Sequence, residues 1–207
     1  MAFLHFCNMQ RNWKIRFFLY INYFVFAILL NSVGIVIAKS INVYGVDEKA
    51  ASTLEAFKDL PIAIVSFLIA SFLPRLGYKR GMLIALMIVF IGCLAMWFAN
   101  SFFAAKMLFL SVGVSFALIK LSVYGLVGLV TQTPQQHSSL MSSVEAVFMV
   151  GIATAYFLFP AFYDDTDVNA WLNVYLLLSV LIAISFLCLL FSGIQMPAEP
   201  AGTDWKE

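Results

Sequence analysis

The sequence predicts an all-α membrane protein with six transmembrane helices. Hydrophobic residues make up 63% of the 207 residues and charged residues only 11%, whereas a soluble domain carries roughly 25% charged residues. The apolar residues fall into runs near the ~20 residues that a helix needs to cross the hydrocarbon core. In order, the six runs cover residues 17–41, 53–76, 81–99, 104–130, 140–162 and 170–194.

A basic loop between the second and third runs orients the other segments. This loop, residues 73–81, holds Arg75, Lys79 and Arg80, and Lys and Arg clustered between two spans mark the cytoplasmic side. Six spans then place both termini in the cytoplasm. We expect an N-terminal flank over residues 1–16, a lipid bilayer around the spans, and a membrane of the bacterial inner (plasma) type.

The first two runs carry polar residues inside or near the bilayer. The first run is longer than the ~7–15 apolar residues of a secretory signal, so we expect a retained anchor. Asn31 interrupts this run past its middle, and Lys39 lies near its outer end. The second run begins with Glu55, Lys58 and Asp59, which share one helical face. Charges facing lipid are costly, so that face should look into protein or water.

The later runs differ in polarity. The third run has no charged residue and is the best candidate for a lipid-exposed helix. The fourth run is rich in small residues, which let helices approach closely in lipid, and it carries Lys120 and Tyr124. Glu145 lies early in the fifth run, after the loop 131–139. The acidic loop 164–167 should be external.

Lys120 and Glu145 are expected to form an ion pair. Lys120 lies about three residues past the middle of its run and Glu145 about six residues before the middle of the next. At ~1.5 Å per residue their depths differ by ~4–5 Å, and consecutive helices are often neighbours. Such a pair either holds two helices in register or binds solute and changes protonation during transport.

Six polar side chains form the predicted solute and ion pathway: Lys120, Glu145, Asp59, Asn31, Tyr124 and Lys39. No H-E-x-x-H, P-loop or G-x-S-x-G motif is present, so the sequence gives no sign of an enzyme. The three cysteines and two histidines form no metal-ligand pattern. No cofactor, metal or nucleic-acid partner is therefore expected.

The basic loop resembles that of major facilitator superfamily transporters, whose pattern is roughly G-x-x-x-D-R-x-G-R-K. Residues 70–79 keep Arg75, Gly77 and Lys79 at matching positions. Three positions depart from the pattern: Ala70, Pro74 and Tyr78. The resemblance implies a cytoplasmic gating loop that includes Arg75, Gly77, Lys79 and Arg80, but the missing acid, which helps to lock the family's gate, puts that lock in doubt.

The form L-G-Y-K-R-G is more similar to the loop of the fucose-permease-like sugar/proton symporters, and the resemblance extends from about residue 30 to residue 160. That group ties proton coupling to one acid in the first helix and one in the fourth. Gly34 and Lys120 stand at those positions here. Fucose/proton chemistry therefore does not carry over, and Lys120 favours an anionic group.

The resemblance implies one half of a twelve-helix transporter, built as a three-plus-three inverted repeat with the solute at mid-membrane. We expect the N-terminal half of a secondary active transporter, a symporter for a sugar or an organic anion, with Glu145 or Asp59 as an optional proton site. Its partner would be a C-terminal six-helix half, reached through a linker that includes residues 195–207, or a second copy. The alternative is a non-transporting six-helix scaffold or sensor.

Overall fold

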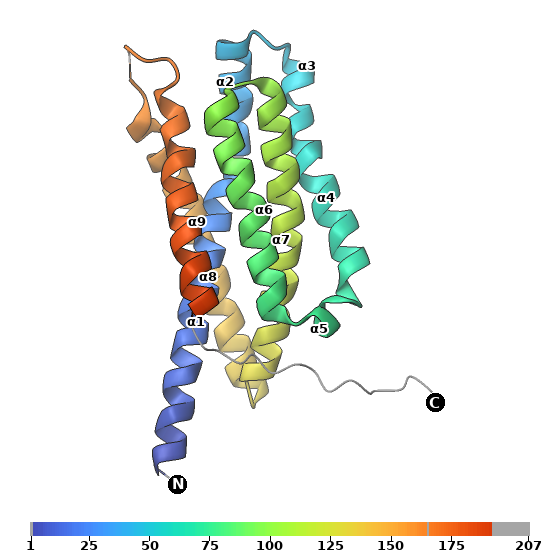
Figure 1. Cartoon of the computed structure of the whole chain (residues 1–207), viewed down its shortest axis with the longest axis vertical. Coiled ribbons are helices and arrows are strands. Elements are labelled where there is room, and N and C mark those ends of the chain that lie inside the picture. Colours follow the sequence, from blue (N-terminus) through green and yellow to red (C-terminus); the bar gives the residue numbers. More distant parts are fainter. Residues whose placement is uncertain (1, 165, 192–207) are drawn as a thin grey trace.

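The computed structural model describes residues 2–164 and 166–191. This part of the chain is a bundle of helices without a strand (Figure 1). The predicted tail, residues 195–207, lies outside the described residues. The α-helices are α1 (Ala2–Asn31), α2 (Val33–Tyr44), α3 (Glu48–Ala51), α4 (Thr53–Ala70), α5 (Leu73–Leu76), α6 (Tyr78–Ala99), α7 (Phe102–Val130), α8 (Pro134–Leu158) and α9 (Asn173–Phe191). Two short 3-10 helices cover Pro160–Phe162 and Ala170–Leu172.

Five helical segments in the described ranges are long and apolar enough to cross a membrane, as expected of an integral membrane protein in contact with lipid. They are Ile15–Tyr44, Tyr78–Ala99, Phe102–Val130, Pro134–Phe162 and Ala170–Phe191. The second predicted run is the exception. Its helix α4 has 18 residues, and Glu55, Lys58 and Asp59 lie within them. Length allows α4 to cross ~27 Å, but its composition sets it apart from the other five.

The end of α4 departs from the prediction, which carried the second run to residue 76. The helix ends at Ala70, and the separate turn α5 holds Pro74 near its start. In a continuous helix the Pro74 ring would clash with the carbonyl of residue 70, four positions earlier. Proline therefore separates the basic loop from the helix before it.

Both the first and fifth runs begin earlier than expected. Helix α1 starts at Ala2, inside the segment predicted as a flank. Helix α8 starts at Pro134 because the Thr133 side chain accepts a hydrogen bond from the backbone N–H of Gln136 at 3.2 Å. A threonine N-cap followed by proline is a favoured start for a helix. The polar segment 134–139, predicted as loop, is therefore the first part of α8.

The helices alternate in direction, so the connections gather at two ends (Figure 1). The N-terminus, α5 and the α7–α8 connection lie at the lower end of Figure 1, whereas α3 and the α6–α7 connection lie at the upper end. We call these the basic end, which holds Arg75, Lys79 and Arg80, and the opposite end. The basic loop and the loop after α7 thus lie on one side, as the alternating spans predict.

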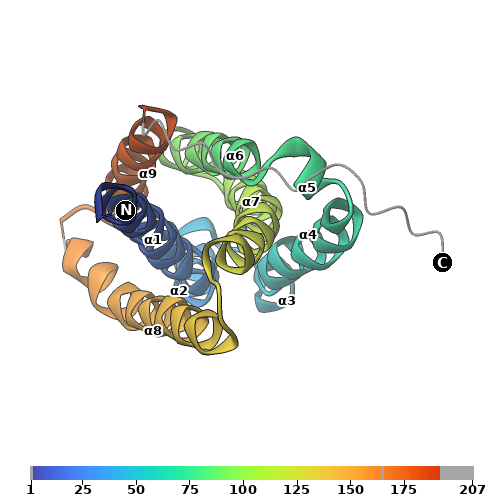
Figure 2. The same cartoon turned by 90° about the horizontal axis from the view of Figure 1, so that it is seen from below.

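Packing pairs the first three long helices with the last three. Helix α4 packs along α7, α1 packs along α8, and α6 packs along α9 (Figure 2). Exchanging α1 with α7, α4 with α8 and α6 with α9 turns the α4–α7 pair into the α8–α1 pair and leaves α6–α9 unchanged. The same exchange would turn the α6–α7 contact, the most extensive one between described helices, into the much smaller α1–α9 contact, so the two groups of three agree in three contacts and differ in this one.

Two glycines let these paired helices approach closely. A Cβ added at Gly113 on α7 would collide with the backbone carbonyl oxygen of Lys58 on α4. A Cβ added at Gly151 on α8 would lie 2.8 Å from the carbonyl oxygen of Phe24 on α1. Such small-residue contacts replace the hydrophobic driving force that helices lack in lipid.

Exposure of the long helices differs from the prediction. The charge-free third run, whose helix is α6, was expected to be the most exposed, but α8 is the least buried of the five apolar helices. Large apolar side chains are also exposed along α4, where Phe67 is 84% exposed. Because α6 packs against both α7 and α9, the scarcity of charge on a helix does not place it at the edge of the bundle.

Candidate functional site

The first span is interrupted near the middle of the membrane. Helix α1 ends at Asn31 and α2 begins at Val33, and the span Ile15–Tyr44 has its midpoint between residues 29 and 30. Ser32 at the interruption donates from Oγ to the carbonyl oxygen of Leu29 at 2.7 Å. Side chains that bond backbone groups in this way commonly bend helices. The polar residue that interrupts the apolar run in the sequence, Asn31, is thus also the last residue of α1.

Helix α9 contacts the interruption through a buried hydrogen bond. The Tyr175 hydroxyl donates to Ser32 Oγ at 3.4 Å, and both residues are buried. Asn31 donates from Nδ2 to the carbonyl oxygen of Ala27 at 2.9 Å. Its Oδ1 accepts no hydrogen bond from any described residue and can accept one from a ligand, because an amide group has both functions.

A polar hollow opens on the other side of the interruption. It has a volume of about 530 Å³ and reaches from α1 and α2 across to α4 and α8. Four apolar residues of α1 and α2 complete a lining whose remaining members are Asn31, Gly34, Glu55, Lys58, Tyr156 and Tyr163. No atom lies within 4 Å of a Cβ added at Gly34, so this glycine leaves open space in the wall.

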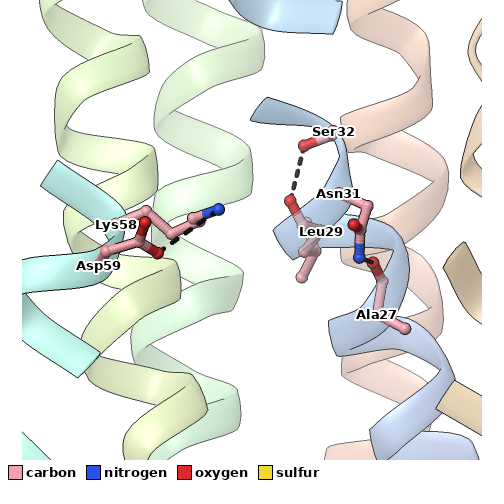
Figure 3. Close-up of polar contacts among 6 residues, drawn as sticks. All are labelled: Ala27, Leu29, Asn31, Ser32, Lys58 and Asp59. Atoms are coloured by element: carbon pink, nitrogen blue, oxygen red, sulfur yellow. Dashed lines mark hydrogen bonds and ion pairs between the residues drawn. The ribbon is translucent and has the colours of Figure 1, made fainter. Parts of the chain in front are cut away.

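Lys58 reaches into the hollow from α4. Figure 3 shows its side chain extending from α4 toward the chain segment that carries Asn31 and Ser32. The Lys58 side chain is 16% exposed, and its Nζ lies 3.5 Å from Asp59 Oδ1. This is the one ion pair within 4.0 Å in the described ranges. The ammonium therefore retains donors for a second acceptor.

Asp59 and Glu55 occupy different positions although both were expected on one face. Glu55 lines the hollow, whereas Asp59 is not among the lining residues and its side chain is 64% exposed. Asp59 therefore neutralises Lys58 from the outer surface of α4. Glu55, three residues before Lys58, shares with it the side that faces the hollow, as that spacing predicts, whereas Asp59 does not.

Lys39 does not line the hollow itself but contacts Tyr163, which does. Its Nζ lies 3.9 Å from the centre of the Tyr163 ring, a cation–π contact. Burial raises the pKa of the Tyr163 phenol above its ordinary value, so the hydroxyl stays protonated at neutral pH and remains a donor. Lys39 thus lies beside the hollow through Tyr163, which lines it.

The direct ion pair expected between Lys120 and Glu145 does not form. Instead, Tyr124 lies between them: its hydroxyl donates to Glu145 Oε1 at 3.1 Å, and Lys120 Nζ lies 5.6 Å from the centre of its ring. Helix α8 packs mainly along α1 and meets α7 over a much smaller area. Consecutive helices are therefore poor neighbours here, which explains why the depth arithmetic gave the wrong contact.

An aromatic layer separates this second polar cluster from the hollow. Tyr23 and Phe26 of α1, Phe116 of α7 and Phe148 of α8 make ring contacts with centroid distances of 5.6–6.2 Å. Along α8, Phe148 stands between Glu145 and Tyr156, which lines the hollow. Along α7, Phe116 is nearer than Lys120 and Tyr124 to the end of the bundle on which the hollow lies. The two polar clusters are thus on opposite sides of the aromatic layer.

The residues of the predicted gating loop take different positions at the basic end. Arg75 and Arg80 are exposed. Gly77, with φ of 88°, joins α5 to α6. Lys79 donates from Nζ to the carbonyl oxygen of Leu190 at 3.4 Å and so ties α6 to the last turn of α9. None of the four is among the residues that line the hollow.

Sequence reasoning missed four polar members of the hollow. Glu55 and Lys58 were recognised as charges on one face but were not chosen as pathway residues; their i, i+3 spacing was the signal. Tyr156 and Tyr163 come from α8 and the loop after it. Their approach to Asn31 depends on how α8 packs along α1, which no local pattern reports.

Comparison with known proteins adds no relative: no family model matches this sequence, and no curated protein matches it.

Proposed function

We propose that this chain is a six-helix half of a secondary active transporter for a small polar solute, a sugar or an organic anion. The solute would bind in the polar hollow. The observation that carries the proposal is the hollow itself: charged and hydrogen-bonding groups from α1, α4 and α8 converge between the interruption at Asn31 and the opposite end of the bundle. Polar groups inside membrane-spanning helices are costly and usually functional.

The chemistry of the hollow suits a solute with hydroxyl or carboxylate groups. Lys58 and the two tyrosines supply donors, while Asn31 Oδ1 and Glu55 supply acceptors. The cation of Lys58 would pair with an anionic group, and the acceptors would bind hydroxyl groups. A volume of about 530 Å³ accommodates a small molecule.

Two features of the fold support alternating access. The α4–α7, α1–α8 and α6–α9 contacts map onto one another as in a three-plus-three repeat, although the α6–α7 contact does not. Helices interrupted near the midplane are typical of such transporters. The aromatic layer around Phe116 would close the hollow toward the basic end. Movement of that layer would open the second cluster, where Glu145 offers a site for a coupled proton.

Helices α4 and α8 both contribute to the lining of the hollow, and both carry exposed large apolar side chains. We propose that a second six-helix half, or a second copy of this chain, covers these side chains and completes the solute path. The basic end would be cytoplasmic by the positive-inside rule, with both termini inside and the protein in a bacterial inner membrane. Arg75, Gly77, Lys79 and Arg80 would then shape the cytoplasmic closure.

Uptake by cells that express the intact gene tests the proposal. A panel of radiolabelled sugars and small carboxylates is offered to cells carrying the wild type, Lys58→Gln, or Lys49→Gln as matched control, an exposed lysine on the short helix α3. We expect at least one solute to accumulate, with a loss of roughly tenfold or more in Lys58→Gln alone because one charged hydrogen bond contributes about 1.5–3 kcal/mol. Equal uptake by all three strains and by empty cells would favour the scaffold.

A further inference from the structure

A second hollow lies on the outer surface of the bundle, between α6 and α9. Its volume is about 160 Å³. Only apolar side chains line it: Leu86, Met87 and Phe90 from α6 and Ile182, Ala183, Phe186 and Leu187 from α9. Helix α6 is a membrane-spanning segment by length and composition, so an apolar groove on its surface faces hydrocarbon.

Two cations stand at the basic end of the same pair of helices. Lys79 and Arg80 are the second and third residues of α6. Lys79 is half-buried beside the last turn of α9, where one of its three donors reaches the carbonyl oxygen of Leu190. Arg80 is exposed, and it shares its helical stripe with the exposed residues Ile84 and Met87. The stripe leads from Arg80 into the groove.

The distance along α6 from the two cations to the groove is similar to the hydrocarbon thickness of one bilayer leaflet. Leu86 and Phe90 lie seven and eleven residues beyond Lys79, which is ~10–16 Å along a helix. One leaflet contributes ~15 Å of hydrocarbon. A headgroup phosphate at Lys79 and Arg80 would therefore place its acyl chain at the level of the groove.

We propose that the α6–α9 groove binds one anionic phospholipid, with its phosphate on Lys79 and Arg80 and an acyl chain in the groove. Basic pockets between helices on the cytoplasmic side bind anionic headgroups by charge attraction, and the apolar lining selects a chain over a polar ligand. The groove shares no lining residue with the polar hollow, and α4, which lines the hollow, lies on the side of α6 away from α9 (Figure 2). The lipid site does not depend on the transport proposal.

Native mass spectrometry of the full chain in detergent tests this site. The protein is titrated with phosphatidylglycerol or phosphatidylcholine, and the occupancy of the first bound lipid is measured. We expect the wild type to retain phosphatidylglycerol preferentially. The double variant Lys79→Gln/Arg80→Gln should lose about thirtyfold in phosphatidylglycerol affinity, since each cation near an anionic headgroup contributes roughly one factor of five. Arg75→Gln, an exposed cation on α5, is the matched control and should bind as the wild type does.

A second variant tests the groove separately from the charges. Ala183→Phe fills the groove and should lower the occupancy by both lipids, whereas Ile184→Phe, one position around α9 and 52% exposed, should not. Melting temperatures confirm that each variant is folded. Equal phosphatidylglycerol binding by the wild type, the double variant and Ala183→Phe would overturn the proposal. A change of oligomeric state in Ala183→Phe without a change in lipid occupancy would overturn it too, because the groove would then hold a second copy.

Discussion

Tyr124 on α7 donates a hydrogen bond to Glu145 on α8 at 3.1 Å. This contact joins two helices that otherwise meet over a small area. The centre of the same tyrosine's ring lies 5.6 Å from Lys120 Nζ, so one side chain lies next to both charges of the second polar cluster. A neutral hydroxyl thereby stabilises a carboxylate that lipid would penalise, and it does so without a direct salt bridge.

Tyr124→Phe should lower the stability of the folded chain. The substitution keeps the ring and removes the donor, leaving Glu145 without its described partner at a cost of about 1–3 kcal/mol. Melting of the detergent-purified protein, followed by intrinsic fluorescence, measures the loss. Tyr156→Phe is the matched control because its side chain is 62% exposed; an equal loss in both variants would contradict the role of the Tyr124 hydroxyl.

Double-mutant cycles should separate contact from proximity in the same cluster. We expect a coupling of about 1 kcal/mol or more between Tyr124→Phe and Glu145→Gln, and a much smaller coupling between Lys120→Gln and Glu145→Gln. Residues in direct contact couple by about 0.5–3 kcal/mol, and separated residues are nearly additive. The reverse ranking would restore the direct Lys120–Glu145 ion pair.

Gly113→Ala should weaken the packing of α7 against α4. Its added methyl group would meet the backbone carbonyl of Lys58, and backbone cannot move aside as a flexible side chain can. Overpacking of this kind typically costs about 1–3 kcal/mol. Gly128→Ala on the same helix meets no atom within 4 Å and should be neutral. Melting temperatures of the two variants compare them, and equal values would show that α4 does not sit this close to α7.

Gly77→Ala should strain the basic loop. Gly77 has φ of 88° and ψ of 129°, a region that side chains with a Cβ avoid at a cost of roughly 1–3 kcal/mol. The expected result is a lower melting temperature than that of the wild type, with Gly128→Ala again as control. A melting temperature equal to that of the wild type would show that the loop adopts another backbone conformation.

The sequence was sufficient for the helices but not for their contacts. Apolar runs and helix caps are local features of the sequence. The apolar runs around Asn31 and Lys120 therefore predicted the first and fourth spans well. Thr133, which caps α8, also marked the start of that helix in the sequence, but this signal was not used. The hollow depends instead on which helix packs beside which. The inferred neighbours α7 and α8 make few contacts, whereas Tyr156 of α8 and Lys58 of α4 line one hollow together with Asn31. These relations belong to the tertiary structure.

Thiol accessibility at residue 34 tests the central claim that the hollow is a solute path with two-sided access. Gly34→Cys is placed in a chain whose three natural cysteines are replaced, and a membrane-impermeant thiol reagent is added to intact cells or to inside-out vesicles. Ile91→Cys, a lipid-facing position in the middle of α6, should react from neither side. We expect the thiol introduced by Gly34→Cys to react from both sides, because the protein alternates between two open states. Reaction from one side alone, or from neither, would contradict alternating access and leave a static bundle.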